Sequence, residues 1–126
     1  MLLDSNIIIY AAYPNQGAIR QFIRDNAPFV SIISYVEVLG YHRLTDEARQ
    51  FFVEFFETSE MLPLTDEIAI QAVELRQQRR MTLGDSLIAG TVIVNNLTLV
   101  THNRQDLEWI SGLSLHDPLD LQNEEA

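Results

Sequence analysis

The chain begins with Met1-Leu2-Leu3-Asp4-Ser5-Asn6-Ile7-Ile8-Ile9-Tyr10, and this stretch decides the fold class. An apolar run at 1–3 stops at an acid, and a polar pair then leads into a second apolar run at 7–10. A short apolar run that ends at a polar turn is typical of a strand buried on both faces. We therefore expect residues 1–10 to form the central strand of a sheet, with Asp4 at its carboxyl end. Ligands bind at that edge in open α/β sheets.

The rest of the chain alternates between strand and helix patterns. Runs rich in apolar residues at 29–33, 61–64, 97–101 and 113–115 predict further strands, and Pro63 indicates that one of these lies at an edge. Apolar residues at helical spacing predict helices at 19–26, 34–41, 65–80, 86–95 and 103–110, and one that begins at Thr45. Helix 86–95 is apolar nearly all round, so we expect it to be buried, with Ala89-Gly90 letting it approach the sheet closely. The alternation predicts an α/β domain with a mostly parallel sheet.

Composition narrows the chemistry. The 126 residues suit one domain, and 47% of them are hydrophobic. The formal net charge is −10, all eight basic residues are arginine, and cysteine is absent. Without lysine there is no P-loop and no Schiff-base catalysis, and without cysteine there is no thiol nucleophile or thiolate metal site. No apolar run is long enough for a membrane span and no basic signal-peptide region is present, so we expect a cytoplasmic protein.

Four acids occupy the same kind of place in the predicted fold. Asp4 follows the first strand, and the other three fall in the first turns of predicted helices: Glu37, Asp85 and Asp106. Each of those three lies three residues after a capping residue, so each one alone is better explained as part of a helix cap. Gathered in one cleft, however, the four would repel one another, which a fold tolerates where a cation binds. Oxygen ligands favour Mg²⁺ or Mn²⁺, so the sequence predicts a metal site at this edge of the sheet.

Several other groups have plain structural explanations. The histidines are scattered and support no Ser-His-Asp arrangement: His42, His102 and His116. Three arginines end a predicted helix, where cations complement the helix dipole: Arg76, Arg79 and Arg80. The phenylalanines at 51, 52, 55 and 56 form a broad apolar helix face, which favours core packing over a protein-binding surface.

Four motifs resemble those of the PIN-domain ribonucleases, and among them the VapC-type toxins of bacterial and archaeal toxin–antitoxin pairs. In chain order they are Leu3-Asp4-Ser5-Asn6, Ser34-Tyr35-Val36-Glu37, Gly84-Asp85-Ser86-Leu87-Ile88-Ala89 and Leu99-Val100-Thr101-His102-Asn103-Arg104-Gln105-Asp106. The resemblance spans residues 1–118. The chain departs from the family in lacking the proline often seen before Asp85. Its charge and its lack of lysine are not typical of a nuclease that grips RNA broadly.

The resemblance implies a three-layer α/β/α PIN fold with a central, mostly parallel sheet of four to five strands. It implies one nuclease domain at 1–118, followed by a polar tail at 119–126. The implied activity is that of an endoribonuclease dependent on Mg²⁺ or Mn²⁺, whose catalytic metal ligands are the acidic quartet Asp4, Glu37, Asp85 and Asp106. Groups that would position these ligands or the phosphate are Ser5, Asn6, Thr101 and Asn103, and the possible RNA contacts are Arg104 and Arg80.

The resemblance also implies partners. It predicts a homodimer and inhibition by a cognate antitoxin, for which the phenylalanine-rich helix offers a groove. Two alternatives stay open beside this interpretation. One is a PIN nuclease that acts in RNA processing or on DNA flaps, outside toxin–antitoxin pairs. The other is a non-catalytic module that keeps the fold and only binds RNA or a protein, against which the complete quartet argues.

Overall fold

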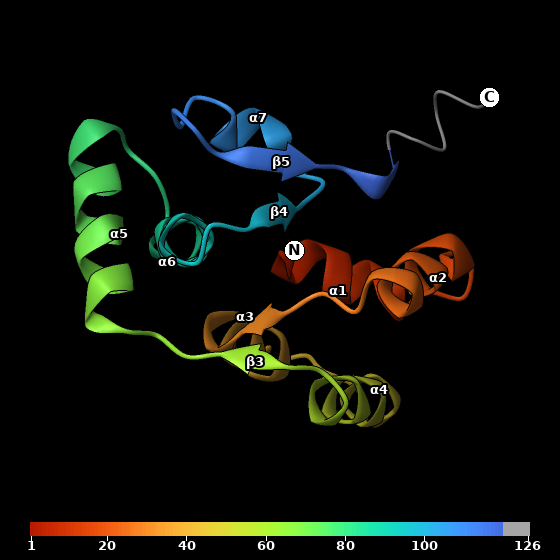
Figure 1. The fold of residues 1–126 in the computed structure, drawn as a ribbon. Coiled ribbons are helices and arrows are strands. Elements are labelled where there is room, and N and C mark those ends of the chain that lie inside the picture. The colour runs from red at the N-terminus through yellow and green to blue at the C-terminus, as the bar shows by residue number, and fades with distance from the viewer. Residues whose placement is uncertain (120–126) are drawn as a thin grey trace.

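The computed structural model describes residues 1–119, and its centre is a parallel sheet (Figure 1). The strands are β1 (Leu2–Leu3), β2 (Val30–Ser31), β3 (Met61–Leu62), β4 (Thr98–Val100) and β5 (Ser114–His116). β4 pairs with both β1 and β5, and β2 pairs with β3. A parallel bridge between Leu2 and Phe29 joins the two groups, so β1 lies at the middle of the order β3-β2-β1-β4-β5. β3 is an edge strand, as Pro63 predicted.

Helices cover both faces of this sheet. They are α1 (Ser5–Ala11), α2 (Gly17–Asn26), α3 (Ile32–Leu39), α4 (Asp46–Glu57), α5 (Asp66–Gln78), α6 (Leu83–Val94) and α7 (Arg104–Leu107). Successive strand residues point to opposite faces. Accordingly, Leu3 and Val100 pack with α1 to α4, whereas Leu2 and Leu99 pack with α5, α6 and the segment around α7. Figure 1 shows α5 and α6 on one side of the molecule and α1, α2 and α4 on the other. The predicted three-layer α/β/α fold with a parallel sheet is confirmed.

The opening stretch differs from its prediction after Asp4. Only Leu2–Leu3 is a strand, and Ser5–Ala11 is helix α1. Burial explains why. Ile7, Ile8 and Ala11 are buried while Ile9 is 39% exposed, which is the one-sided spacing of a helix and not the alternation of a strand. A run of β-branched residues therefore forms a helix because tertiary packing outweighs its local preference.

The segment after the second strand also differs. The predicted strand 29–33 ends at Ser31, whose hydroxyl accepts a hydrogen bond from the backbone N–H of Ile33 and caps α3. The helix thus begins two residues before Ser34, so the predicted capping pair of Ser34 and Glu37 does not form. Ser34 is instead fully buried inside the helix, and Glu37 lies one turn further along it than expected.

Three of the caps predicted elsewhere are present, whereas the cap predicted at Asn103 is not, because its side chain makes no hydrogen bond to the start of α7. Thr45, Thr65 and Thr82 each accept a hydrogen bond from the backbone N–H three residues on, and so begin α4, α5 and α6. α5 and α7 are shorter than predicted, ending at Gln78 and Leu107. The chain turns after α7, and Gly112 there has a φ of +79°, a conformation that favours glycine.

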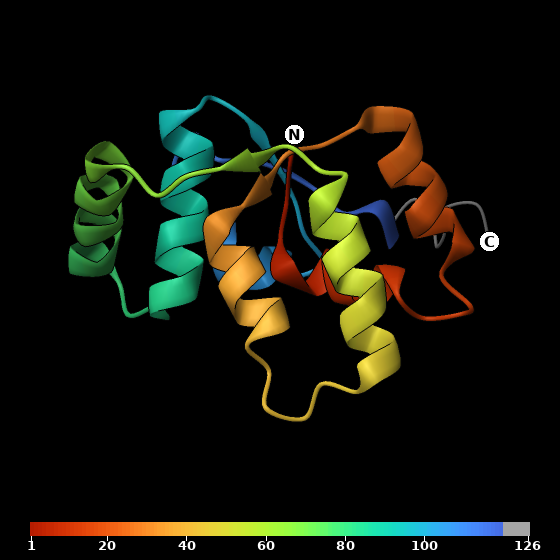
Figure 2. The same cartoon turned by 90° about the horizontal axis from the view of Figure 1, so that it is seen from below.

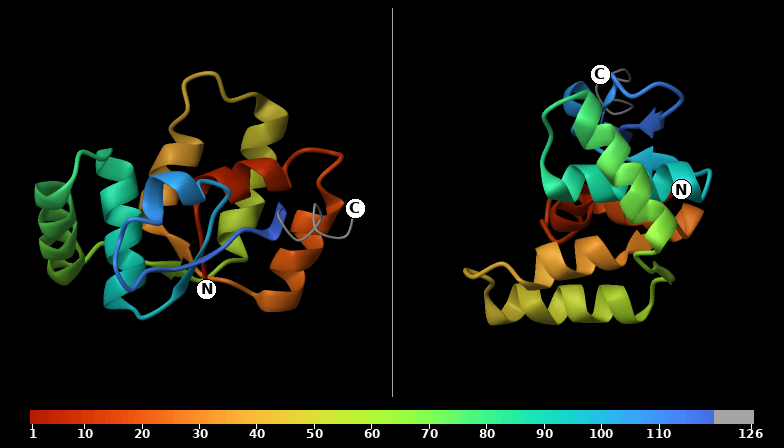
Figure 3. Two further views of the ribbon diagram at one scale, coloured as in Figure 1. Left: turned by 90° about the horizontal axis from the view of Figure 1, so that it is seen from above. Right: turned by 90° about the vertical axis from the view of Figure 1, so that its left-hand side faces the viewer.

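Helix α6 is buried as predicted, but its glycine serves a different contact. A Cβ on Gly90 would lie 3.0 Å from the backbone oxygen of Ile68 in α5. Gly90 therefore lets α5, not the sheet, approach α6 closely, and the right panel of Figure 3 shows the two helices crossing. In the described chain α6 follows helix α5 and not a strand, so its packing against α5, α3 and β4 decides where its first turn lies.

The C-terminal end of the described chain packs against the protein core. Leu119 packs against the core formed with α1 to α4, and its backbone N–H donates to Asp117 Oδ1. The rest of the predicted tail, 120–126, lies outside the described residues. Within residues 1–119, no helix combines the length and apolarity needed to cross a bilayer.

Adjacent isoleucines provide a test of α1. Ile8 is fully buried, so we expect Ile8→Ala to lower the free energy of unfolding by about 2–5 kcal/mol. Ile9 is 39% exposed, and Ile9→Ala should change it by only about 0.5 kcal/mol. Urea unfolding of both variants measures the difference. Equal losses at the two positions would contradict a helix whose one face is buried.

Candidate active site

Asp4 is the fixed point of the candidate site. It follows β1 directly and caps α1, with its Oδ1 accepting from the backbone N–H of Ser5 at 2.8 Å. Its Oδ2 accepts from the hydroxyl of Thr101, which follows β4, also at 2.8 Å. Asp4 is only 7% exposed. Burial raises the pKa of Asp4 above its ordinary value of 3.8, and the charges of Asp85 and Glu37 add to this rise, while the two hydrogen bonds oppose it.

Glu37 reaches the site through two contacts. The Ser5 hydroxyl lies 2.9 Å from both Glu37 Oε1 and Ser34 Oγ. The Ser5 hydroxyl is the donor toward both oxygens, and because it has one proton it donates to one of them at a time. On the other side, the Glu37 Oε2 lies 2.8 Å from the position that a Cβ would occupy on Gly84. The missing side chain at Gly84 therefore leaves room for this carboxylate against the first turn of α6.

Asp85 is the third acid, and it lies in that same first turn of α6. Its backbone N–H donates to the cap Thr82 Oγ1 at 3.1 Å, so the predicted cap is present. Its charge raises the pKa of Asp4, so its carboxylate lies within electrostatic reach of that acid. Partial burial raises the pKa of Asp85 above 3.8, and the charge of Asp106 raises it further, while a second hydrogen bond, which the Asp85 carboxylate accepts from the Thr82 hydroxyl, opposes the rise. Asp85 thus combines the cap position with a place in the acidic cluster.

The segment after β4 contributes hydrogen-bonding groups to the candidate site. The Thr101 hydroxyl accepts from the backbone N–H of Asn103 at 2.9 Å while donating to Asp4. The backbone N–H of His102 donates to Asn6 Oδ1 at 3.4 Å, which links α1 to this segment. His102 Nδ1 also lies 2.8 Å from Oδ2 of the buried Asp117, at the end of β5. Three neighbouring strands therefore deliver polar groups to one edge of the sheet.

The remaining predicted residues lie further out. Asp106 is exposed on α7, and Asn103 precedes that helix without capping it through its side chain. Arg104, the first residue of α7, and Arg80, in the loop before α6, are both exposed. Arg79 lies over the ring of Trp109, with its guanidinium carbon 5.5 Å from the ring centroid. Of the predicted arginines, Arg79 therefore has a structural role between α5 and the turn after α7.

Electrostatic repulsion links the four acids pairwise, in the order Glu37, Asp4, Asp85 and Asp106. Asp4 is affected by Glu37 and by Asp85, and Asp85 is affected by Asp106. Within residues 1–119, no three acidic, histidine or cysteine side chains are close enough to enclose one ion. Mg²⁺ commonly takes only one or two carboxylates and keeps several waters. The residues present therefore fit an ion held by a carboxylate pair and water, and do not fit an ion enclosed by the whole quartet.

Three residues at this edge were not predicted from the sequence as parts of the site. Ser34 looked like a helix cap, Gly84 looked like a residue of a helix start, and Asp117 looked like the end of the last strand. Only Asp117 carried a usable signal, because an acid directly after a parallel strand points to the same edge as Asp4. The contacts of Ser34 and Gly84 depend on how α3 meets α1 and α6.

Comparison with known proteins agrees with this architecture. A family model that describes the PIN domain matches residues 1–110. A toxin–antitoxin complex from Klebsiella pneumoniae contains a chain 25% identical to this one, with a TM-score of 0.74 over 93% of this chain and 96% of that chain. DNA-bound VapBC from Salmonella typhimurium matches with 25% identity and a TM-score of 0.80, over 93% and 96%. A search of curated proteins gave no match.

A third solved structure is similar to this chain in fold. VapBC2 from Rickettsia felis, solved bound to a DNA fragment from its promoter, is 22% identical with a TM-score of 0.81, over 91% of this chain and 96% of that chain. The family model covers residues 1–110, which is most of the described chain. The chain belongs to the PIN domain family, as its four motifs predicted, and its fold matches that of chains solved in VapBC complexes.

Proposed function

We propose that this chain is an endoribonuclease dependent on Mg²⁺ or Mn²⁺ and that it is the toxin of a VapBC-like toxin–antitoxin pair. The observation that carries the proposal is the row of mutually repelling acids that includes the buried Asp4 at the end of β1 and three acids from α3, α6 and α7. A fold gains no stability from such repulsion, so the acids are explained by a cation that they hold. RNA is the substrate class that the motifs imply.

Two carboxylates would hold the ion directly, and Asp4 and Asp85 are the pair that the charge coupling favours. Glu37 and Asp106 would hold it through water or by direct contact when substrate is present. When bound, such an ion lowers the pKa of a water molecule and stabilises charge on a phosphate. The charge of the ion would also lower the raised pKa values of Asp4 and Asp85 and keep both ionised.

The chain's own residues would orient these groups. Thr101 and the Ser5 backbone N–H occupy one oxygen of Asp4 each, so they fix the carboxylate plane. The Ser5 hydroxyl does the same for Glu37, which is placed to orient an attacking water and to accept a proton from it. Asn6 and Asn103 flank the segment after β4, and their amide groups are proposed to position phosphate oxygens, while Arg104 and Arg80 are proposed RNA contacts.

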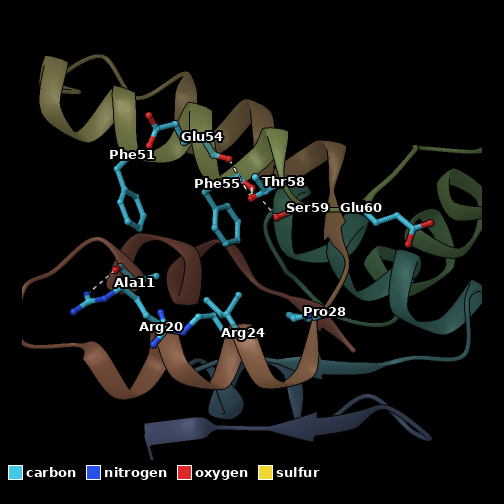
Figure 4. Close-up of a pocket in the computed structure, with 12 residues that line it drawn as sticks. Ala11, Arg20, Arg24, Pro28, Phe51, Glu54, Phe55, Thr58, Ser59 and Glu60 are labelled. Atoms are coloured by element: carbon cyan, nitrogen blue, oxygen red, sulfur yellow. Dashed lines mark hydrogen bonds between the residues drawn. The ribbon is translucent and has the colours of Figure 1, made fainter.

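An antitoxin segment is proposed for the groove between α2 and α4. Figure 4 shows Phe51 and Phe55 of α4 pointing toward α2, above Arg20 and Arg24. The groove has a volume of about 610 Å³ and is mostly apolar along its walls. An amphipathic helix places its apolar side in such a groove, and a basic one suits a chain with a net charge of −10. Co-expression with a small protein encoded next to this gene should block cleavage, and continued cleavage in a stable complex would contradict the proposal.

A homodimer is proposed through an apolar patch at the edge of the sheet. The patch is lined by six residues from α3 and the β3 segment: Ile32, Ile33, Val36, Met61, Pro63 and Leu64. Val36 is 62% exposed and Leu64 is 45% exposed. Exposed apolar patches of this kind mark interaction sites, and the same patch on a second copy forms a self-complementary interface.

Cleavage of RNA is the direct test of the proposed activity. We expect the protein, freed of any partner, to cut single-stranded RNA with Mg²⁺ or Mn²⁺ and to stop when EDTA removes the metal. Asp4→Asn should lower the rate by at least about 100-fold, since changes even to groups that support metal ligands cost 10–100-fold. Gel analysis of labelled RNA measures both effects. Absence of cutting by the unmutated protein would favour a binding module over an enzyme.

The same variant tests the electrostatics of the site. The raised pKa means that the folded chain holds the Asp4 proton to higher pH than the unfolded chain does, so Asp4 lowers the free energy of unfolding as the pH rises from 3.8 through its raised pKa. An amide at this position removes that cost. In EDTA, Asp4→Asn should therefore melt at a higher temperature than the unmutated protein at pH 7, and the gain should shrink as the pH falls through the raised pKa and be absent below 3.8. A lower melting temperature at pH 7 would contradict the buried, repelled carboxylate.

Gly84 tests whether the position of Glu37 matters. A Cβ at Gly84 would displace the Glu37 carboxylate, but only the end of a flexible side chain has to move. We expect Gly84→Ala to keep its melting temperature and to lose about 10- to 100-fold in cleavage rate. Gly17→Ala is the matched control, because its Cβ would meet no atom closer than 3.6 Å. Equal rates for the two variants would show that Glu37 does not need this position.

A charged substitution in the apolar patch tests the proposed dimer. Leu64→Glu places a carboxylate in the centre of the apolar patch, so we expect the variant to be a monomer where the unmutated chain is a dimer. Light scattering during size-exclusion chromatography gives the mass. Gln77→Glu adds the same charge at an exposed position of α5 and should leave the dimer intact. A monomeric unmutated chain, or a dimer that survives Leu64→Glu, would rule out this interface.

A further inference from the structure

A pocket beside the acids has a lining that the proposed reaction does not use. It lies where the end of α1 faces α3, the loop after α3 and the start of α4, and its volume is about 750 Å³. Figure 2 shows this loop projecting from the body of the protein. We call it the tyrosine pocket, and the lining residues that matter below are Ile9, Tyr13, Glu37, Tyr41, Arg43 and Glu47.

The tyrosine pocket is continuous with the candidate active site through Glu37. One oxygen of this carboxylate accepts from Ser5, next to Asp4, and the other lies against Gly84, next to Asp85. The same side chain also forms part of the pocket wall. A nucleotide whose phosphate lies at the acids therefore has the tyrosine pocket directly beside it.

Two exposed aromatic rings give the pocket its chemistry. Tyr13 is 47% exposed and Tyr41 is 54% exposed, so each leaves ring surface open. Both are supported by neighbouring rings. The ring of Tyr13 packs edge-on against the ring of Tyr10, with 5.8 Å between the ring centroids. The ring centroids of Tyr41 and His42 are 5.2 Å apart. Supported, open tyrosine rings are surfaces on which nucleobases stack.

The charges of the pocket favour a base over a phosphate. Glu37 and Glu47 face a single cation, Arg43, so the pocket keeps a net negative charge within a chain of net charge −10. Such a wall repels phosphate. A nucleobase is flat and uncharged, and its edge has both donors and acceptors, which Glu47 and Arg43 can match. A chain of net charge −10 gains less from general phosphate contacts than a basic one does, so contacts to the bases can supply a larger share of its RNA affinity.

We propose that the tyrosine pocket binds a nucleobase of single-stranded RNA next to the scissile phosphate, stacked on Tyr13 or Tyr41. This inference rests on the proposed function, whose substrate it narrows to unpaired RNA held mainly through a base. It also separates the pocket from the groove of Figure 4, which is proposed for a protein segment and which shares Phe51 with it.

The test combines tyrosine variants with abasic RNA. All measurements use the Asp4→Asn background, so that binding is measured without cleavage, by fluorescence anisotropy of a short labelled single-stranded RNA in Mg²⁺. Tyr41→Ala or Tyr13→Ala should raise the Kd about 5- to 150-fold, the range that corresponds to ~1–3 kcal/mol for one stacked base. Phenylalanine at the same position should restore binding. Tyr35→Ala, at an exposed ring outside the pocket, is the matched control and should leave the Kd unchanged.

Scanning one abasic site along the RNA locates the bound base. At one position the abasic site should weaken binding to the Tyr41-containing protein, and it should have no further effect on the variant that has lost the stacking ring. The affinity should also vary weakly with salt, because few phosphates are neutralised.

The outcomes separate this proposal from the nuclease proposal. Unchanged affinity in both tyrosine variants, or equal binding of every abasic RNA, would overturn the base pocket and leave the surface to a protein partner, even if the unmutated chain cleaves RNA. Tyrosine-dependent and base-dependent binding by a chain that never cleaves would support the pocket and overturn the nuclease.

Discussion

The carboxylate of Asp4 is the contact on which the rest of the site depends. It joins the start of α1 to the segment after β4, because one oxygen accepts from Ser5 and the other from Thr101. The hydrogen bond from Thr101 connects residues 97 positions apart in the chain, and the one from Ser5 connects neighbours. They also stabilise the ionised form of a buried acid, against a larger effect of burial. Once Asp4 is fixed, Ser5 is placed to reach Glu37, and Thr101 is placed to receive the Asn103 backbone N–H.

Repulsion between the acids around Asp4 affects the stability of the protein. Asp85 and Glu37 each raise the pKa of Asp4, so we expect the protein without a cation to be less stable at neutral pH than a variant with a neutral side chain there. Stability of this kind is commonly given up at sites that bind a charged ligand. Under the proposed function, a cation would remove this repulsion and would leave positions for a substrate phosphate. The same acidity would limit the proposed RNA contact, since a chain of net charge −10 cannot rely on the release of counterions from the phosphate backbone.

Much of the fold and the candidate acids was predictable because the signals were local. Threonine caps marked the starts of α4, α5 and α6, and apolar runs marked all five strands. The helix α1 was not predictable, because Ile7, Ile8 and Ile9 favour a strand locally and become helical only when α2 and α3 cover one side of them. The start of α3 was misplaced for a similar reason, since Ser31 and Ser34 are both plausible caps and only the packing chooses between them.

The sequence by itself determined the parallel α/β layering, the three threonine caps and the four candidate acids, because each depends on residues close together in the chain. The tertiary structure alone decided which groups meet. It brought Ser34 to Ser5, left room at Gly84 for Glu37, joined His102 to Asp117 and opened the tyrosine pocket beside Glu37. The physical reason is that these contacts depend on how helices from distant parts of the chain cross, and side-chain volume at the crossing is not encoded in any local pattern.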